Sequence, residues 1–118
     1  MEYKGEKRSG KFHGKGKLID ENGNTYEGEF QLGEFHGQGK FIVDGNLTCE
    51  GKWVRGELIE GSMRDKVENF LYEGEIKDFK RHGKGIFFNY EDKRKFQGYW
   101  EDNVLEDSED DWEVETIE

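Results

Sequence analysis

Apolar and polar residues alternate over short stretches of this chain, and the alternation restarts every 23 residues. In residues 26–41 the aromatic residues and glycines take alternate positions, and charged or polar residues lie between them. Because successive side chains of a β-strand point to opposite faces, this pattern predicts paired strands with one apolar face. Between such strands, Gly33 and, in a later copy, Asp78 predict tight hairpin turns with positive φ.

Each copy opens on an aromatic residue or its replacement, with a glycine two residues later. The copies start at Tyr3, Tyr26, Cys49, Tyr72 and, one residue late, Phe96. Self-similarity at a short fixed period predicts an array of like units in which each unit completes the core of its neighbours. We therefore predict an all-β fold, a single elongated and twisted antiparallel meander of repeated β-hairpins with about nine or ten strands and open edges.

Glycines recur inside the predicted strands, where they normally weaken pairing. Here they accompany aromatic residues, and a ring can lie flat over the bare glycine backbone of a neighbouring strand, an arrangement called aromatic rescue. Stacked units would then collect their rings on one face as an aromatic–glycine groove. We expect partner contacts from this groove and from a tryptophan near the C-terminus, at Tyr26, Phe30, Phe41, Trp53, Tyr72, Phe87, Phe96, Trp100 and Trp112.

The second copy, YEGEFQLGEFHGQGKF, resembles the MORN (membrane occupation and recognition nexus) repeat. The marks are Y-x-G, a turn glycine and H-G-x-G, and residues 13–16 and 82–85 repeat the last of these. Two copies match less well. The third has Ile59-Glu60-Gly61-Ser62 in place of H-G-x-G, and a one-residue bulge would return Gly61 to a glycine position. The fifth is predicted to be a half repeat, residues 96–100, so the resemblance covers residues 3–100.

Charge divides the chain into two parts. Residues 1–100 contain all 18 basic residues and 18 of the 28 acidic ones, whereas residues 101–118 contain the other 10 acids and no base. The net charge of −10 therefore belongs to the C-terminal part. We predict a MORN-repeat array over residues 1–100 and an acidic tail over residues 101–118 that is disordered or docked on a partner.

A tryptophan within the acidic tail suggests more than a solubilising role. Trp112 would anchor a short recognition element that folds on a basic partner or docks back on the array. Residues 111–115 alternate in polarity and could add a strand to a sheet edge. Ser108 precedes a run of acids and resembles an acidophilic kinase site.

The chemistry-bearing residues form no catalytic pattern. His13, His36 and His82 hold the same position in different hairpins, roughly 9–10 Å apart, too far to share one zinc ion. We expect each to pair with a glutamate near its hairpin turn. The H-G-x-G strings lack the following helix of a phosphate-binding loop. We predict no enzyme activity, no metal and no cofactor.

The single cysteine excludes a disulfide within the chain and favours a reducing compartment. Cys49 stands in the aromatic position, where we expect a small buried hydrophobe rather than a redox switch. The polar start predicts no secretory or transit signal, and no apolar run approaches the length of a membrane span. We therefore expect a cytoplasmic location.

These observations favour a protein–protein scaffold or adaptor that accepts an extended or helical segment. The MORN resemblance implies a place in a cytoskeletal, ciliary or flagellar (axonemal) assembly. The alternatives are a peripheral phospholipid-binding module and a regulatory subunit of an enzyme. A net charge of −10 disfavours anionic lipid and nucleic acid, although six basic residues within residues 1–19 keep lipid open. Homo-oligomers are compatible with the two open sheet edges.

Overall fold

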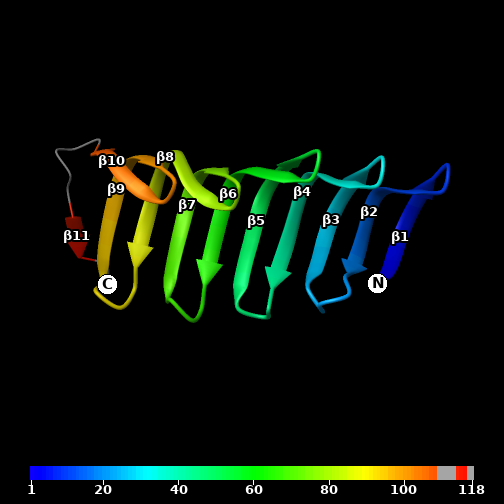
Figure 1. Ribbon diagram of the computed structural model, residues 1–118, viewed down its shortest axis with the longest axis horizontal. Helices are drawn as coiled ribbons and strands as arrows, with labels where there is room; N and C mark the ends of the chain where they lie inside the picture. The colour runs from blue at the N-terminus through cyan, green and yellow to red at the C-terminus, as the bar shows by residue number, and fades with distance from the viewer. Residues whose placement is uncertain (109–113, 117–118) are drawn as a thin grey trace.

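A computed structural model of the 118-residue chain describes residues 1–108 and 114–116, with side chains as far as residue 106. Eleven strands form one antiparallel sheet in which β1 to β10 follow each other in order and β11 pairs with β9 (Figure 1). The strands are β1 (Glu2–Arg8), β2 (Lys11–Ile19), β3 (Thr25–Gln31), β4 (Glu34–Val43), β5 (Leu47–Val54), β6 (Glu57–Asp65), β7 (Phe70–Lys77), β8 (Lys80–Asn89), β9 (Arg94–Glu101), β10 (Val104–Ser108) and β11 (Val114–Thr116). The predicted open meander is confirmed.

Each hairpin ends in a two-residue turn whose central residues both have positive φ. These pairs are Ser9-Gly10, Leu32-Gly33, Arg55-Gly56, Asp78-Phe79 and Asp102-Asn103. Two positive φ values define the type I′ turn, whose twist matches that of paired strands. The turn predictions at Gly33 and Asp78 are confirmed, and at the fourth turn Phe79 also has a positive φ, of 58°.

A line of glycines, here called the glycine row, crosses the sheet with one residue from each of β1 to β9. Its members face each other in register and are Gly5, Gly16, Gly28, Gly39, Gly51, Gly61, Gly74, Gly85 and Gly98. A Cβ atom on Gly28 would lie 2.4 Å from the Cα of Gly39, so only bare backbone allows this approach. Figure 1 shows each hairpin bent near its turn end.

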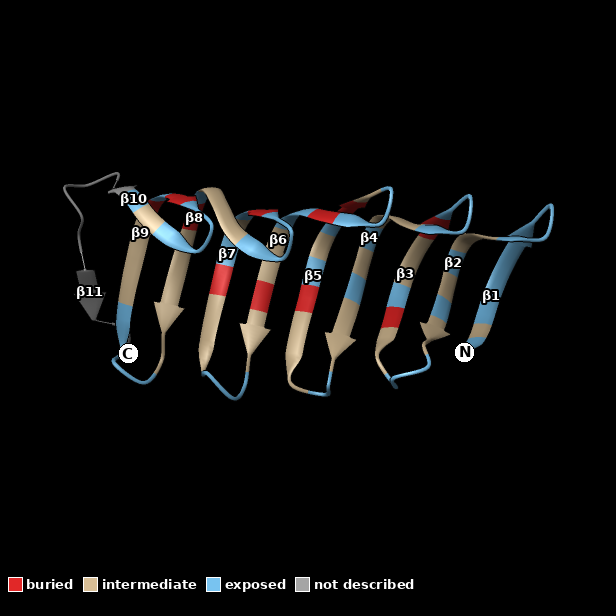
Figure 2. Cartoon of the chain, in the orientation of Figure 1, coloured by how far each residue is buried: buried red, intermediate tan, exposed pale blue. Residues whose placement is uncertain are grey.

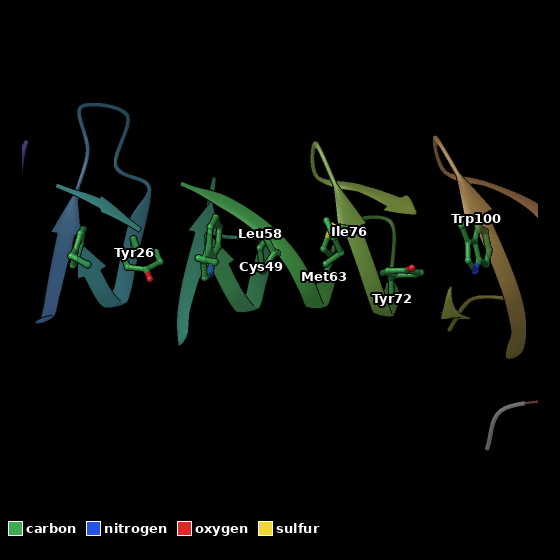
Figure 3. Packing of buried hydrophobic residues seen from close by; sticks show 9 residues of the cluster. Tyr26, Cys49, Leu58, Met63, Tyr72, Ile76 and Trp100 are labelled. Carbon is green, nitrogen blue, oxygen red and sulfur yellow. The ribbon is translucent and has the colours of Figure 1, made fainter. Parts of the chain in front are cut away.

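The aromatic side chains fill the inside of these bends. The Tyr26 hydroxyl lies against Gly39 and donates a hydrogen bond to the Glu29 carbonyl at 2.8 Å. The Trp53 indole N–H donates to the Gly39 carbonyl at 2.9 Å. The predicted packing of rings over glycine is therefore confirmed. Figure 3 shows the buried cluster, whose members are Tyr26, Phe30, Cys49, Trp53, Leu58, Met63, Tyr72, Ile76 and Trp100.

Hydrogen bonds between turn ends add to the sheet pairing. The amide of the second turn residue donates to a carbonyl of the preceding hairpin, from Gly33 to Phe12 at 3.1 Å and from Gly56 to Phe35 at 2.9 Å. Asn103 forms the same bond at the fifth turn. Within residues 1–108 the fourth turn, at Phe79, does not form this bond. At this end the fourth turn contacts the third hairpin through the Phe79 ring, which lies 6.0 Å from the Trp53 ring between centroids.

The two atypical units are both hairpins. Gly51 faces Gly61 across a register shift next to Lys52, so the predicted bulge that returns Gly61 to a glycine position is confirmed. The fifth unit extends beyond the predicted half repeat, since β10 pairs with β9 with Ser108 opposite Gly98. Further along the same edge of β9, Val114 of β11 faces Phe96. The sheet therefore continues past residue 100 into the acidic segment.

Candidate functional site

The predicted partner-contact residues divide by burial. Five of them belong to the buried cluster, namely Tyr26, Phe30, Trp53, Tyr72 and Trp100. Tyr26 and Trp53 are 1% exposed, and their polar atoms already bond to the backbone of the array. The expectation that these five rings form an open groove is corrected, because the bent hairpin ends enclose them as core.

The other predicted contacts are partly exposed or lie outside the described side chains. Phe41, Phe87 and Phe96 pack against the edge of the buried cluster and stay partly accessible. Trp112 lies outside the described residues, so its role stays a prediction. The accessible aromatic surface is therefore smaller than predicted and lies at the margins of the core.

One accessible patch is built around Phe79, which sequence reasoning did not select. Its ring is 45% exposed and lies 6.0 Å from the Trp53 ring and 6.3 Å from the Phe41 ring, between ring centroids. We call the exposed Phe79, the partly exposed Phe41 and the buried Trp53 that they contact the Phe79 patch. Phe79 comes from the fourth turn, yet it reaches β4 and β5. The signal in the sequence was a phenylalanine where the first three turns have glycine.

A second patch surrounds Arg81, which holds the position of Phe12 and Phe35 in earlier units. Its guanidinium carbon lies 4.3 Å from the Phe87 ring centroid and 5.0 Å from that of Trp100. We call these three residues the Arg81 patch. Such cation–π contacts are strengthened when the charge is partly removed from water.

The polar atoms of Arg81 are only partly satisfied. One terminal nitrogen donates to the Asn103 carbonyl at 2.8 Å, whereas the Nε atom is buried with no hydrogen-bond partner in the described part of the chain. Burial lowers the pKa of Arg81 from its ordinary value. The buried Nε is out of reach of a partner, but the side chain as a whole is partly exposed, so its positive charge can attract a carboxylate of a partner.

The H-G-x-G string has a structural explanation. The Glu29 carboxylate accepts a hydrogen bond from the Gln38 amide at 2.6 Å, and Gly37 between them has a φ of 89°. Glu75 accepts a hydrogen bond from the Lys84 amide at the same distance, and Glu6 accepts the equivalent bond within the first unit. The first glycine thus forms a bulge, the residue after it offers its amide to the glutamate, and the second glycine joins the glycine row.

The expected pairing of histidine with glutamate is corrected by this geometry. Glu29 binds a backbone amide, and His36 accepts a hydrogen bond from the Arg55 amide at 3.4 Å. The carboxylate prefers the amide because the bulge points that N–H at it, at a distance typical of charge-assisted bonds. The His36 side chain thus contacts the neighbouring hairpin.

A comparison with protein families matches this pattern. The model of the MORN repeat matches residues 3–25, 26–47 and 72–88, together more than half of the chain. The chain belongs to the MORN repeat family. The matched segments leave out residues 48–71, where the MORN hairpin persists without the tyrosine and H-G-x-G marks. A comparison with curated proteins finds no match.

MORN repeats are in general protein- or membrane-binding modules without catalytic activity. In this MORN array, no group of three or more His, Cys, Asp or Glu side chains able to hold a metal ion occurs among the described residues. No helix of the described residues is long and apolar enough to cross a membrane. The polar face carries two shallow hollows of about 590 and 620 Å³ lined by mixed charges.

Cys49 is fully buried, in agreement with its expected role as a small hydrophobe. Burial raises the pKa of the Cys49 thiol to about 12, so the nucleophilic thiolate does not form near neutral pH. Burial likewise raises the pKa of Tyr26 and of Tyr72 to about 12. The burial of Cys49 and the raised pKa of its thiol both weigh against a redox switch at this position.

Proposed function

We propose that this MORN array is a non-catalytic protein–protein scaffold that binds an extended or helical segment at the Phe79 and Arg81 patches. The observation that carries the proposal is Phe79, a large aromatic side chain held exposed in a positive-φ turn. A bulky residue in that backbone conformation costs about 1 kcal/mol, and the ring still keeps 45% of its surface exposed after its contacts with Phe41 and Trp53. Rigid exposed aromatic residues are typical anchors of binding surfaces.

The side chains of the two patches indicate which kind of partner segment they would bind. Phe41 and Phe79 offer apolar surface for an aromatic or aliphatic side chain of the partner. Arg81, a partly exposed positive charge beside Phe87, favours an acidic side chain. The proposed partner segment therefore carries an apolar anchor and an acidic residue.

The proposed setting is a cytoskeletal, ciliary or flagellar assembly in the cytoplasm. The reduced and inaccessible Cys49 fits a reducing compartment, and the family resemblance supports an adaptor role. A regulatory subunit of an enzyme would use the same surface, with the enzyme as the bound partner. Identification of the captured protein distinguishes the two.

The test is affinity capture with the full chain and with matched variants, followed by binding to the purified partner. We expect Phe79→Ser together with Arg81→Gln to abolish capture of a protein that the unchanged chain enriches. The control is Leu32→Ser, which removes a 70%-exposed apolar residue from the corresponding turn of the second hairpin. Equal capture by all three baits would contradict the proposed site.

A membrane-surface role is the alternative that one observation favours. Lys4, Lys15 and Lys17 line a hollow on the polar face of the first two hairpins, together with Glu27 and Glu29. Anionic headgroups are attracted by such clusters, at about 1 kcal/mol per lysine, whereas the net charge of −10 repels them. Flotation with phosphoinositide vesicles tests this role, and a chain that stays at the bottom of the gradient excludes it.

A further inference from the structure

The first strand, β1, forms one edge of the sheet. Among the described residues it pairs only with β2, and its aromatic residue Tyr3 stays partly exposed, whereas Tyr26 and Tyr72 are buried between neighbouring strands. Figure 2 shows no buried position on β1 or β2. An edge strand of this kind is a template for pairing with a strand of another chain.

The polar face of β1 has charges of alternating sign. In chain order they are Glu2, Lys4, Glu6 and Arg8. Lys4 faces Lys17 across the first hairpin, and these like charges repel each other. Arg8 likewise faces Lys11 next to the turn. The two basic residues of this face therefore do not stabilise the pairing of β1 with β2.

The order of these charges is complementary to itself about Gly5. When two β1 strands pair antiparallel with Gly5 opposite Gly5, residues at equal distances from Gly5 face each other. Lys4 of each copy then faces Glu6 of the other, and Glu2 of each copy faces Arg8 of the other. Opposite charges placed directly across a strand pair stabilise a sheet, so this register pairs every charge of the face favourably.

The neighbouring registers of the same strand pair are unfavourable. Centring the pair on Lys4 would place Lys4 opposite itself and Glu2 opposite Glu6. Centring it on Glu6 would place Glu6 opposite itself and Lys4 opposite Arg8. Like charges directly opposite each other destabilise a sheet. The charges of β1 therefore select one register as well as the pairing itself.

The other edge of the sheet does not complement β1 in this way. Within hairpin-to-hairpin pairs the row glycines face each other, and Ser108 of β10 holds the corresponding position opposite Gly98. If Gly5 of a second copy faced Ser108, Glu6 would face Asp107. This pair of acidic residues disfavours an open chain of copies and leaves β1 itself as the better partner of β1.

The selected register also continues the glycine row. Inside the array the row glycines of neighbouring hairpins face each other without a register shift, as Gly16 faces Gly28. Gly5 opposite Gly5 repeats that contact between two copies, with bare backbone on both sides. Because the hairpins bend at this row, a two-fold axis through Gly5 brings the bends of the two copies together. The bend is therefore compatible with the pairing.

The core face of β1 fits the same register. Lys7 stands at the position of the buried Phe30, and its Nζ atom lies 6.0 Å from the Phe12 ring centroid. Phe12 stacks on Tyr3 with 3.8 Å between the ring centroids. With Gly5 opposite Gly5, Lys7 faces Tyr3 of the other copy, where an ammonium group over the ring is favourable. A lysine at an edge repels an apolar strand but suits this one.

We propose that this chain forms a two-fold symmetric dimer in which β1 of one copy adds antiparallel to β1 of the other, with Gly5 at the axis. The contact uses the same surface of both copies, so assembly stops at two. Because β1 lies at one end of the array (Figure 1), the dimer is about twice as long as one copy. The proposal does not depend on the partner site at the Phe79 and Arg81 patches.

Charge changes on β1 test the proposal in the full chain. The acidic variant carries Lys4→Glu and Arg8→Glu, and the basic variant carries Glu2→Lys and Glu6→Gln. The glutamine keeps an oxygen for the Lys15 amide, which Glu6 binds at 2.7 Å. The acidic variant removes two like-charged pairs from its own hairpin. Both variants should therefore fold, and circular dichroism checks this.

Sedimentation velocity measures the association. At about 0.1 M salt, and between about 10 μM and about 1 mM protein, the mean mass of the unchanged chain should rise about twofold and no further, because a contact of one strand pair is weak. Each variant alone should stay monomeric. Their equimolar mixture should dimerise again, since it joins an acidic β1 to a basic β1. Small-angle X-ray scattering should give the dimer about twice the length of the monomer.

The control is Lys77→Glu with Lys80→Glu, which changes the net charge as much as the acidic variant does, at exposed positions beside the fourth turn. It should dimerise like the unchanged chain. Phe79→Ser with Arg81→Gln should do so too, which separates this contact from the partner site. The proposal is overturned if the unchanged chain is monomeric throughout, if it grows beyond two copies, if either β1 variant dimerises alone, or if the mixture stays monomeric.

Discussion

The second and third hairpins, β3–β4 and β5–β6, share a backbone fold but reach it with different residues. In the second hairpin, Glu29 accepts the Gln38 amide across a bulge formed by Gly37. The third hairpin has Lys52 in place of that glutamate and a return strand one residue shorter. The register shift leaves one extra residue in the third hairpin and two in the second, so the positive-φ glycine and the glutamate that binds the next amide are lost together.

What the two hairpins keep in common is the glycine row. Gly28 faces Gly39 in one, and Gly51 faces Gly61 in the other. The close backbone approach at these positions sets the bend, and large side chains then fill the space inside it. The glycine row is therefore a requirement of the fold. The glutamate at the bulge only refines it.

The largest effect should come from breaking the glycine row in the third hairpin. A Cβ atom at Gly51 would lie 2.1 Å from the Glu60 carbonyl oxygen, so Gly51→Ala should lower the free energy of unfolding by about 3 kcal/mol or more. Urea unfolding followed by circular dichroism measures the loss. Gly23→Ala is the control, with positive φ but open space around it, and should cost about 1 kcal/mol. If the two variants lose the same free energy of unfolding, the glycine row is not a requirement of the fold.

A smaller effect should distinguish the two bulges. Glu29→Ala removes a charge-assisted hydrogen bond at a partly exposed site, so it should cost about 1 kcal/mol. Lys52→Ala, at the corresponding position of the third hairpin, should leave the free energy of unfolding nearly unchanged. Thermal and urea unfolding of the two variants give the comparison, and a loss at Lys52 as large as at Glu29 would contradict the assignment.

Exchanging the second turn residue between the second and fourth hairpins should show whether this position contributes to stability or to partner binding. Phe79→Gly relieves the positive-φ conformation and loses a half-exposed ring contact, so the free energy of unfolding should rise by about 0.5 kcal/mol. Gly33→Phe should lower it by about 1 kcal/mol, since only backbone conformation opposes the ring there. The partner captured by the unchanged chain should be lost with Phe79→Gly. A destabilised Phe79→Gly variant would indicate a purely structural ring.

The last effect is confined to alkaline pH and is absent near neutral pH. The folded pKa of Cys49 is about 12 and its ordinary value is 9.0, so the unfolded thiol ionises first as the pH rises. The unfolded chain then binds fewer protons, and stability is full below pH 9 and falls as pH rises toward 12. Cys49→Val should lessen the fall between these two pH values. A thiol reagent should react with native Cys49 far more slowly than with the unfolded chain, and equal rates would contradict its burial.

Some features of the site were predictable from the sequence and others were not. The bulge at Gly61 followed from counting positions between glycines, because strand register depends on a period of two residues. The strand at Val104–Ser108 was missed, since an edge strand needs no aromatic residue and Ser108 takes the place of a row glycine. Arg81 and Phe79 were missed because each replaces the residue type that the repeat has at its position. The repeat pattern does not predict the role of such a replacement.

The sequence by itself determined the first four hairpins, the single open sheet and the side of each strand that is apolar, since all of these depend on residues close together in the chain. Only the tertiary structure decided which aromatic residues are core and which are accessible. Bending at the glycine row brings each turn end over the rings of its own and neighbouring hairpins. Burial of Trp53 and exposure of Phe79 therefore depend on contacts between units that no single repeat contains.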